Sequence, residues 1–334
     1  MPALEMPFGP EGWTPQRLGD LFGKTYVITG ATTGLGFEAT KLLISKGAKV
    51  VMLNRCPNKS ADVMETVRQD FPTSADNLSF VLMDLSDLSS VRKAAAQLLE
   101  GGSSPVSTID ALICNAAIAQ VPKQKLTKDG FESQLGVNHM GHFLLCGLLS
   151  CKVESSRGRI VVVSSLGYKM GLKKINFDDL NFDQKYDANT VYSQSKLAQM
   201  IFAYELMRRI QASGKKYPKV LVCHPGCSRT ELCKEEIKSQ CFTSCVFSCL
   251  MRSSLSQTAE KGSWPEVMCA AEEEHLEVGS EDVQEPKLYG PTGSLELKGP
   301  VGVNTLDKEI TLDQAAAVRL WSISEEKVGF KWEL

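Results

Sequence analysis

The sequence predicts an α/β protein with one doubly wound parallel sheet of about seven strands and helices on both faces. Short apolar runs alternate with longer segments of helical apolar spacing, as in chains that build parallel sheets through right-handed crossovers. The short runs are apolar at consecutive positions, which is typical of strands that are buried on both faces. A glycine-rich turn directly follows the first run and opens the first helix.

The expected elements follow one another in a regular order. Strands are expected at Tyr26–Ile28, Lys49–Leu53, Leu78–Met83, Ile109–Cys114, Arg159–Val163 and Val220–Cys223. Helices are expected at Leu35–Lys46, Ser60–Gln69, Leu88–Leu99, Phe131–Leu149 and Val191–Gln211. After the sixth strand the alternation stops, and we expect helices within 233–263 and 315–325 with an acidic, solvated loop at 272–285.

Length alone suits about two domains, but the motifs described below extend past any mid-chain boundary. We therefore expect a lead-in at 1–22 and a single domain at 23–334. Its cofactor-binding and catalytic core is expected at 23–230, and its substrate loop and C-terminal extension at 231–334.

Composition excludes several classes of protein. The 334 residues include 37 Lys and Arg and 39 Asp and Glu, a net charge of −2 that argues against a nucleic-acid-binding protein. No apolar run reaches the ~18 residues that a transmembrane helix needs. The first residues lack the apolar centre of a signal peptide. The 11 scattered cysteines favour reduced thiols and a cytoplasmic location.

The glycine turn has the spacing GxxxGxG. Gly30 permits a tight turn, Gly34 lets the backbone approach a pyrophosphate, and Gly36 lets the helix pack against the strand. The free N–H groups at the start of the helix then face the anion. The turn therefore predicts a Rossmann-type dinucleotide site that includes Gly30, Thr32, Thr33, Gly34, Leu35 and Gly36.

The end of the second strand indicates which dinucleotide is bound. Sites for NAD place a carboxylate there to accept hydrogen bonds from the ribose 2′-hydroxyl. This chain has Asn54 and Arg55 instead. A guanidinium suits a 2′-phosphate through charge-assisted hydrogen bonds, so NADP(H) is favoured over NAD(H).

A tyrosine and a lysine share one face of the fifth predicted helix. Tyr192 and Lys196 are four residues apart, and a neighbouring ammonium lowers the pKa of a phenol from its usual value near ~10. Such a tyrosine can exchange a proton with a carbonyl or alcohol centre. The preceding strand ends in Ser164 and Ser165, and a slip of one residue in the strand alternation would exchange their faces.

In the order of its motifs, the chain resembles a short-chain dehydrogenase/reductase. The motifs are Thr29–Gly36, Asp84-Leu85, Asn115-Ala116-Ala117, Asn138, Ser165, Tyr192–Lys196 and Pro225–Thr230. It is most similar to the retinol-dehydrogenase-like branch. That closer likeness is carried by Asn138–Leu145, Phe177–Leu180, Tyr192–Ala198 and Leu320–Ser324.

The resemblance implies a role for each motif residue. Tyr192 would be the general acid/base, and Lys196 would lower its pKa and bind the nicotinamide ribose. Ser165 would orient the substrate oxygen, and Asn138 would anchor a water that leads protons to Lys196. The remaining cofactor contacts would come from Asp84, Leu85, Asn115, Ala116, Ala117, Pro225, Gly226 and Thr230, the last at the nicotinamide carboxamide.

One motif departs from the family. Ala117 stands where the family usually has glycine, which puts close backbone approach in doubt. The run Cys114-Asn115-Ala116-Ala117 also resembles light-dependent protochlorophyllide reductases, which reduce a C=C bond. Those proteins carry a cysteine two positions after the lysine, where this chain has Ala198.

The expected function is reversible hydride transfer between NADP(H) and the carbonyl or alcohol group of a lipophilic substrate, such as a retinoid or steroid. Protochlorophyllide-like reduction and a non-catalytic NADP(H)-binding module are the alternatives. The resemblance also implies a homodimer through the helices 131–149 and 191–211, unless the C-terminal extension covers them.

Two further features carry alternatives. Cys241, Cys245 and Cys249 lie along one helical stripe with apolar neighbours. We interpret 241–251 as an apolar face over the substrate cleft, with palmitoylation or peripheral contact with an intracellular membrane as the alternative and a zinc site third. An organelle is the other alternative location. We interpret His139 and His142 as packing or capping residues and expect no metal ion.

Overall fold

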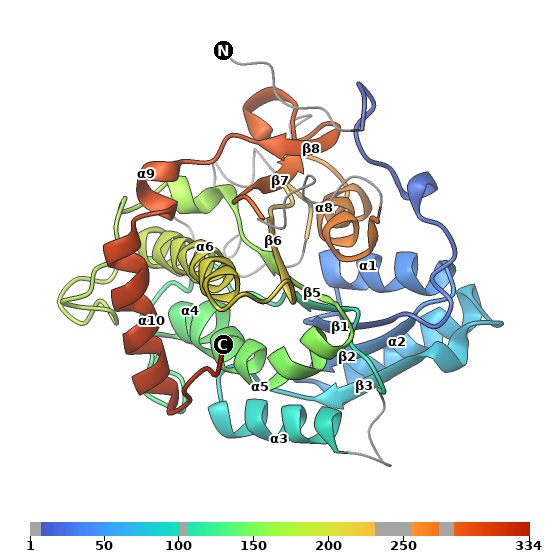
Figure 1. Cartoon of the computed structure of the whole chain (residues 1–334), viewed down its shortest axis with the longest axis horizontal. Coiled ribbons are helices and arrows are strands. Elements are labelled where there is room, and N and C mark those ends of the chain that lie inside the picture. The colour runs from blue at the N-terminus through green and yellow to red at the C-terminus, as the bar shows by residue number, and fades with distance from the viewer. Residues whose placement is uncertain (1–7, 101–105, 231–255, 274–283) are drawn as a thin grey trace.

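The computed structural model describes residues 8–100, 106–230, 256–273 and 284–334 (Figure 1). These residues form one sheet of eight strands in the order β3-β2-β1-β4-β5-β6-β7-β8. Its strands are β1 Thr25–Thr29, β2 Lys49–Asn54, β3 Leu78–Leu82, β4 Ala111–Cys114, β5 Arg159–Val163, β6 Lys219–Cys223, β7 Leu288–Pro291 and β8 Val301–Asn304. All pairs are parallel except β7 with β8.

Helices cover both faces of the sheet (Figure 1). The longer ones are α1 Gly34–Ser45, α2 Pro57–Asp70, α3 Leu88–Leu99, α5 Gly141–Ser155, α6 Ala188–Ala212, α8 Ala259–Ala271 and α10 Gln314–Val328. The shorter ones are α4 Ser133–Leu135 and α9 Lys308–Thr311. Residues of α1, α2 and α8 form one hydrophobic core, and those of α3, α5, α6 and α10 form the other. The predicted fold class is confirmed.

The strand order reverses between β1 and β4. From β1 the chain winds outward to β2 and β3, and from β4 it winds the other way to β8. In such sheets, ligands bind in the crevice outside the carboxyl ends of the strands at the point of reversal. A ligand site is therefore expected at the carboxyl ends of β1 and β4.

The six expected strands are present, and the sheet has two more. Both β7 and β8 come from the C-terminal extension, where no strand was expected. Each is only four residues long and contains glycine, so neither carries a detectable strand pattern. The extension thereby joins the same sheet as the dinucleotide half.

The expected helix at 131–149 is longer and interrupted. It comprises α4, a π-helical segment at Gly136–Met140 and then α5, ending at Ser155. π-Helical turns are rare and occur mostly at functional sites. Most of the expected helix at 233–263 and most of the acidic loop lie outside the described residues; α8 begins at Ala259.

The described part of the lead-in is tied to the C-terminal extension. The Trp13 side chain is fully buried, and its main-chain N–H donates to the Val301 carbonyl oxygen on β8 at 2.9 Å. Its indole Nε1 donates to Glu272 Oε2 at 2.6 Å. The lead-in thus pairs with the outer edge of β8.

The chain's own C-terminus covers the two helices that were expected to meet in a homodimer. Phe143 on α5 and Phe202 on α6 pack against Trp321 of α10, with ring centroids 5.2 and 6.0 Å apart. Trp332 closes this aromatic cluster, 5.2 Å from Trp321. This packing buries one side of α5 and α6 within the chain, and a homodimer through these helices stays a prediction. None of the described helices combines the length and apolar character needed to cross a membrane.

Candidate active site

The glycine turn lies at the carboxyl end of β1 and is shaped by close backbone contacts. Gly30 and Gly34 have φ values of 69° and 62°, in the left-handed region that favours glycine. A Cβ on Gly36 would lie 2.5 Å from Asn115 Nδ2 and 2.6 Å from the Gly30 carbonyl oxygen. No side chain caps the start of α1. The turn therefore offers the free N–H groups at the start of α1, and Gly30, Gly34 and Gly36 leave room for an anion to approach them. This arrangement fits a pyrophosphate.

Gly36→Ala is expected to weaken NADPH binding by about tenfold, because overpacking at backbone contacts costs about 1–3 kcal/mol. The new Cβ would force Asn115 and the turn apart. Gly19→Ala is the control, since a Cβ there meets nothing within 4 Å. A fluorescence titration with NADPH measures both variants. Equal affinities would show that the packing at Gly36 has no bearing on the cofactor.

The two residues at the end of β2 point in different directions. Asn54 is buried, and its Oδ1 accepts a hydrogen bond from the Ala31 N–H at 2.8 Å while its Nδ2 donates to Ser60 Oγ at 3.1 Å. Asn54 thus braces the glycine turn, and its expected contact with the adenosine ribose stays a prediction. Arg55 is exposed and makes no ion pair or hydrogen bond with the residues that the structure describes.

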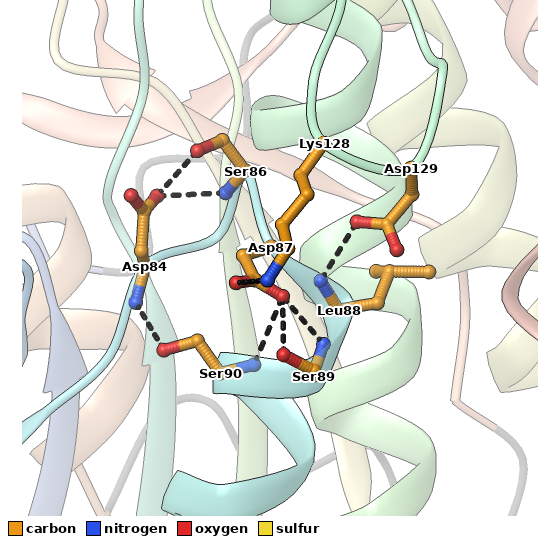
Figure 2. A network of polar contacts seen from close by, with 8 residues as sticks. All are labelled: Asp84, Ser86, Asp87, Leu88, Ser89, Ser90, Lys128 and Asp129. Atoms are coloured by element: carbon orange, nitrogen blue, oxygen red, sulfur yellow. Dashed lines mark hydrogen bonds and ion pairs between the residues drawn. The ribbon is translucent and has the colours of Figure 1, made fainter.

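The loop after β3 is held by a dense polar network (Figure 2). Asp84 Oδ1 accepts hydrogen bonds from the N–H of Ser86 at 2.9 Å and from its Oγ at 2.7 Å. Asp87 caps α3 and pairs with Lys128 at 2.7 Å, and these bonds hold the pKa of its carboxyl well below the usual range. Leu85, also expected at the cofactor, is buried in the core. Of the two residues expected at the cofactor, Asp84 is half-exposed and Leu85 is buried, so only the contact of Asp84 with an adenine stays a prediction that its exposure allows.

The segment after β4 packs directly on the turn. Asn115 Nδ2 donates to the carbonyl oxygens of Thr29 and Gly30 at 2.8 and 3.1 Å. The N–H of Ala116 donates to Thr29 Oγ1 at 2.9 Å. Ala117 is absent from the residues with positive φ, so the replacement of glycine imposes no backbone strain there.

The loop after β6 returns to the same place. The main chain of Gly226 has a φ of 62°, and its N–H donates to His224 Nδ1 at 3.1 Å. The Pro225 carbonyl oxygen accepts hydrogen bonds from Ser228 Oγ and Gln257 Nε2. A Cβ on Gly34 would lie 3.3 Å from Thr230 Cβ. Of the predicted residues in this loop, Thr230 therefore borders the glycine turn.

Ser165 and Tyr192 both lie next to Gly167. Ser165 Oγ accepts from the Gly167 N–H at 3.0 Å, and a Cβ on Gly167 would lie 3.3 Å from that Oγ and 2.9 Å from Tyr192 Cε1. Both side chains are half-buried. Ser164 is buried and donates to the Lys196 carbonyl oxygen at 3.2 Å. Of the two serines, Ser165 thus lies beside Tyr192 and Ser164 bonds to the Lys196 main chain, which favours Ser165 as the serine at the site.

Lys196 is buried behind Tyr192. Its Nζ lies 5.9 Å from the centroid of the Tyr192 ring and donates to the Val163 carbonyl oxygen at 3.1 Å and to Gln199 Oε1 at 2.9 Å. Burial lowers the pKa of Lys196 to about 7. The ammonium and phenol thus occupy one compact site at the carboxyl end of β5.

Asn138 lies in the π-helical segment, and its side-chain amide bonds to neighbouring segments of the protein. Its Oδ1 accepts from the Ile118 N–H, and its Nδ2 donates to the Ile118 carbonyl oxygen and to Ser195 Oγ, all at 2.9 Å. Both amide hydrogens are therefore used within the protein. The expected water between Asn138 and Lys196 stays a prediction.

Some residues singled out in the sequence lie away from the site, and other residues that support the site were not predicted. The stripe at 241–251 lies outside the described residues. His139 and His142 bond to different partners, Ser324 and Thr29, and among the described residues no three His, Cys, Asp or Glu side chains gather as metal ligands. Thr29, Ser195 and Gln199 support the site through buried hydrogen bonds, which no spacing rule reveals.

Comparisons with known proteins show which family and which relatives this chain is similar to. The model of the short chain dehydrogenase family matches residues 24–240. Retinol dehydrogenase 14 from Homo sapiens is 36% identical over 96% of this chain and 92% of its own length. Retinol dehydrogenase 13 from Homo sapiens is 34% identical over 92% of this chain and 86% of its own.

Solved structures share the fold. The crystal structure of an uncharacterized protein from Mycobacterium Paratuberculosis is 32% identical, with a TM-score of 0.72, and the match covers 97% of this chain and 100% of that one. A short-chain dehydrogenase from Sphingobium yanoikuyae in complex with NADPH has 17% identity and a TM-score of 0.54, over 73% of this chain and 83% of that one. The second likeness supports the fold alone.

Proposed function

Because this chain belongs to the short-chain dehydrogenase family, we propose that it transfers a hydride between NADP(H) and the carbonyl or alcohol group of a lipophilic substrate. Family membership and the retinol dehydrogenase relatives make it an oxidoreductase that acts on CH–OH or C=O groups and uses a nicotinamide dinucleotide. The observation that carries the finer proposal is the convergence of Ser165, Tyr192 and Lys196 beside the glycine turn.

A bound dinucleotide supplies or accepts the hydride. In this chain the turn Gly30–Gly36 would hold its pyrophosphate, Asp84 the adenine and Asn115 the adenosine ribose. Thr230, next to Gly34, would hold the nicotinamide carboxamide. Together these residues would orient the dinucleotide toward Tyr192.

The protein itself would handle the proton. In carbonyl reduction the Tyr192 hydroxyl donates a proton to the substrate oxygen, and in alcohol oxidation the phenolate accepts it. A charged Lys196 favours the phenolate of Tyr192. Because the pKa of Lys196 is about 7, contacts with the ribose hydroxyls and the phenol would determine whether Lys196 is charged near neutral pH. Ser165 Oγ donates to the same substrate oxygen and fixes its position.

NADP(H) is proposed over NAD(H) because Arg55 follows β2, is exposed and has no ion pair or hydrogen bond with the described part of the chain. A guanidinium in that state can pair with a 2′-phosphate without first breaking an internal ion pair. Asn54 carries no charge, and both ends of its amide already bond within the protein, so the proposal rests on Arg55.

Arg55→Asp is expected to raise the KM for NADPH by at least about tenfold, because a charge-assisted bond to phosphate contributes about 1.5–3 kcal/mol and a carboxylate repels the phosphate. The KM for NADH should not rise. Lys59→Asp makes the same change of charge at another exposed position on α2 and serves as the control. An equal loss with NADPH in both variants would indicate general electrostatics rather than recognition by Arg55.

For the substrate, we propose a bulky apolar alcohol or aldehyde of the retinoid or steroid kind. The relatives named retinol dehydrogenases support this class. Reduction of a C=C bond as in protochlorophyllide reductases has less support, because Ala198 is fully buried and offers no thiol. A cytoplasmic location, with peripheral membrane contact as the alternative, stays a prediction.

A further inference from the structure

His142 lies in the first turn of α5, buried, and both of its ring nitrogens are engaged. Nδ1 lies 3.0 Å from the Asn138 carbonyl oxygen, and Nε2 lies 2.9 Å from Thr29 Oγ1. A carbonyl oxygen only accepts, so Nδ1 carries the hydrogen and Nε2 accepts from the Thr29 hydroxyl. Burial lowers the pKa of His142 to about 4, which keeps this neutral form at physiological pH.

The bonds continue on the Thr29 side. Thr29 Oγ1 accepts a hydrogen bond from the Ala116 N–H at 2.9 Å. The other acceptor near the Thr29 hydroxyl, the Ile113 carbonyl oxygen, lies at 3.4 Å and is farther away than His142 Nε2. The Thr29 hydroxyl therefore links the segment after β4 to His142 through two hydrogen bonds. Since Thr29 is followed directly by Gly30, these bonds fix the start of the glycine turn.

The bonds also continue on the Asn138 side. Asn138 Nδ2 donates to Ser195 Oγ at 2.9 Å, and that hydroxyl donates to the Tyr192 carbonyl oxygen at 2.8 Å. The Asn138 carbonyl oxygen belongs to the π-helical segment, where the regular ladder of helical hydrogen bonds is interrupted. His142 supplies a donor at this interruption.

We propose that His142 is a positioning residue that couples the dinucleotide-binding turn to the helix turn carrying Tyr192. One imidazole joins the end of β1, the end of β4 and the π-helical segment through directional bonds on both nitrogens. The inference rests on the proposed function of that site. It assigns to His142 no proton transfer and no contact with substrate.

His139 provides a matched control one turn earlier. It is equally buried, and burial lowers its pKa to about 3. Its Nε2 bonds to Ser324 Oγ at 2.8 Å, and its ring packs against Phe143 and Phe202 on the side of the C-terminal extension. It has no bond to Thr29 or Asn138, so its loss should affect stability without reaching the site.

The experiment compares His142→Leu with His139→Leu in the full chain. His142→Leu leaves the Thr29 hydroxyl and the Asn138 carbonyl oxygen without this partner, and we expect about a tenfold weaker NADPH affinity together with a lower kcat. Thermal unfolding of both variants shows that each is folded. NADPH affinity is measured by fluorescence titration, independently of turnover.

Two conservative variants separate the two bonds. His142→Gln keeps an acceptor near the position of Nε2, so NADPH affinity should approach that of the wild type while kcat stays low. His142→Asn keeps a donor near the position of Nδ1, so kcat should recover more than affinity. A residue with a merely structural role would lower both quantities in parallel.

A double-mutant cycle with Thr29→Val tests the coupling directly. In the Thr29→Val background, the effect of His142→Leu on NADPH affinity should largely vanish. Additive effects, or equal losses in the His139 and His142 variants, would overturn the inference. Failure of the proposed function is distinguishable, because a wild type that binds NADPH but reduces no carbonyl still yields the binding cycle.

Discussion

Tyr192→Phe is expected to lower kcat by about 10²- to 10⁴-fold, the contribution typical of a positioned general acid or base. The variant removes only the hydroxyl, and the ring contact with Gly167 stays. NADPH affinity should be unchanged, because the hydroxyl is proposed to act on the substrate oxygen and the pyrophosphate is proposed to bind at the glycine turn. Turnover is measured as NADPH oxidation with an active carbonyl substrate, and affinity by fluorescence titration.

Tyr204→Phe is the matched control on the same helix. Tyr204 is buried, and its hydroxyl donates to the Lys287 carbonyl oxygen at 3.1 Å, away from Ser165 and Lys196. This variant should lose stability and keep its turnover. If the two variants turn over equally, Tyr192 is not the proton donor. If the wild type binds NADPH and oxidises none, the non-catalytic binding module is the better account.

Glu266→Gln is expected to stabilise the protein at neutral pH. Glu266 is buried in α8, and neither carboxylate oxygen has a hydrogen-bond partner among the described residues. Burial raises the pKa of Glu266 from 4.5 to about 8. The folded protein thus retains a proton that the unfolded chain releases, and stability falls as pH rises from about 4.5 to about 8.

The size of this effect follows from the linkage between proton binding and folding. Glutamine does not titrate, so the advantage of Glu266→Gln should grow from about 1 kcal/mol at pH 5.5 to about 4 kcal/mol at pH 7.5. Urea unfolding at both pH values measures it. A difference that is independent of pH would show that Glu266 finds a partner for its charge.

Glu205→Gln is the control with the opposite sign. Glu205 is also buried, but its carboxylate pairs with Arg208 and Arg209 at 2.7 and 2.6 Å. Despite burial, these two guanidinium groups lower the pKa of Glu205. Its replacement should therefore destabilise the protein at neutral pH, whereas replacement of Glu266 stabilises it.

The dinucleotide half of the fold is predictable because its signals are local. An apolar strand, the spacing GxxxGxG and the four-residue separation of Tyr192 and Lys196 are properties of short segments. The structure brings these segments to one edge of the sheet, as parallel topology requires. The choice between Ser164 and Ser165 needed coordinates, since it depends on which side of a doubly buried strand each residue occupies.

The remaining features depend on contacts between distant segments. Asn54 turns inward because the Ala31 N–H needs an acceptor, a demand set by the shape of the glycine turn. Trp13 is buried only because β8, nearly 300 residues later, offers it an edge. From the sequence, His142 is only a histidine on the apolar face of a helix. Its two hydrogen bonds form because the fold brings β1 and the π-helical segment together.

The most direct test of the central claim is a chromatographic assay for the alcohol product. The purified chain is given all-trans-retinaldehyde, a ketosteroid or a long-chain aliphatic aldehyde, with NADPH and NADH in parallel. The account predicts alcohol formation from at least one of these carbonyls, faster with NADPH than with NADH. No alcohol from any of them with either dinucleotide, or a preference for NADH, would contradict it.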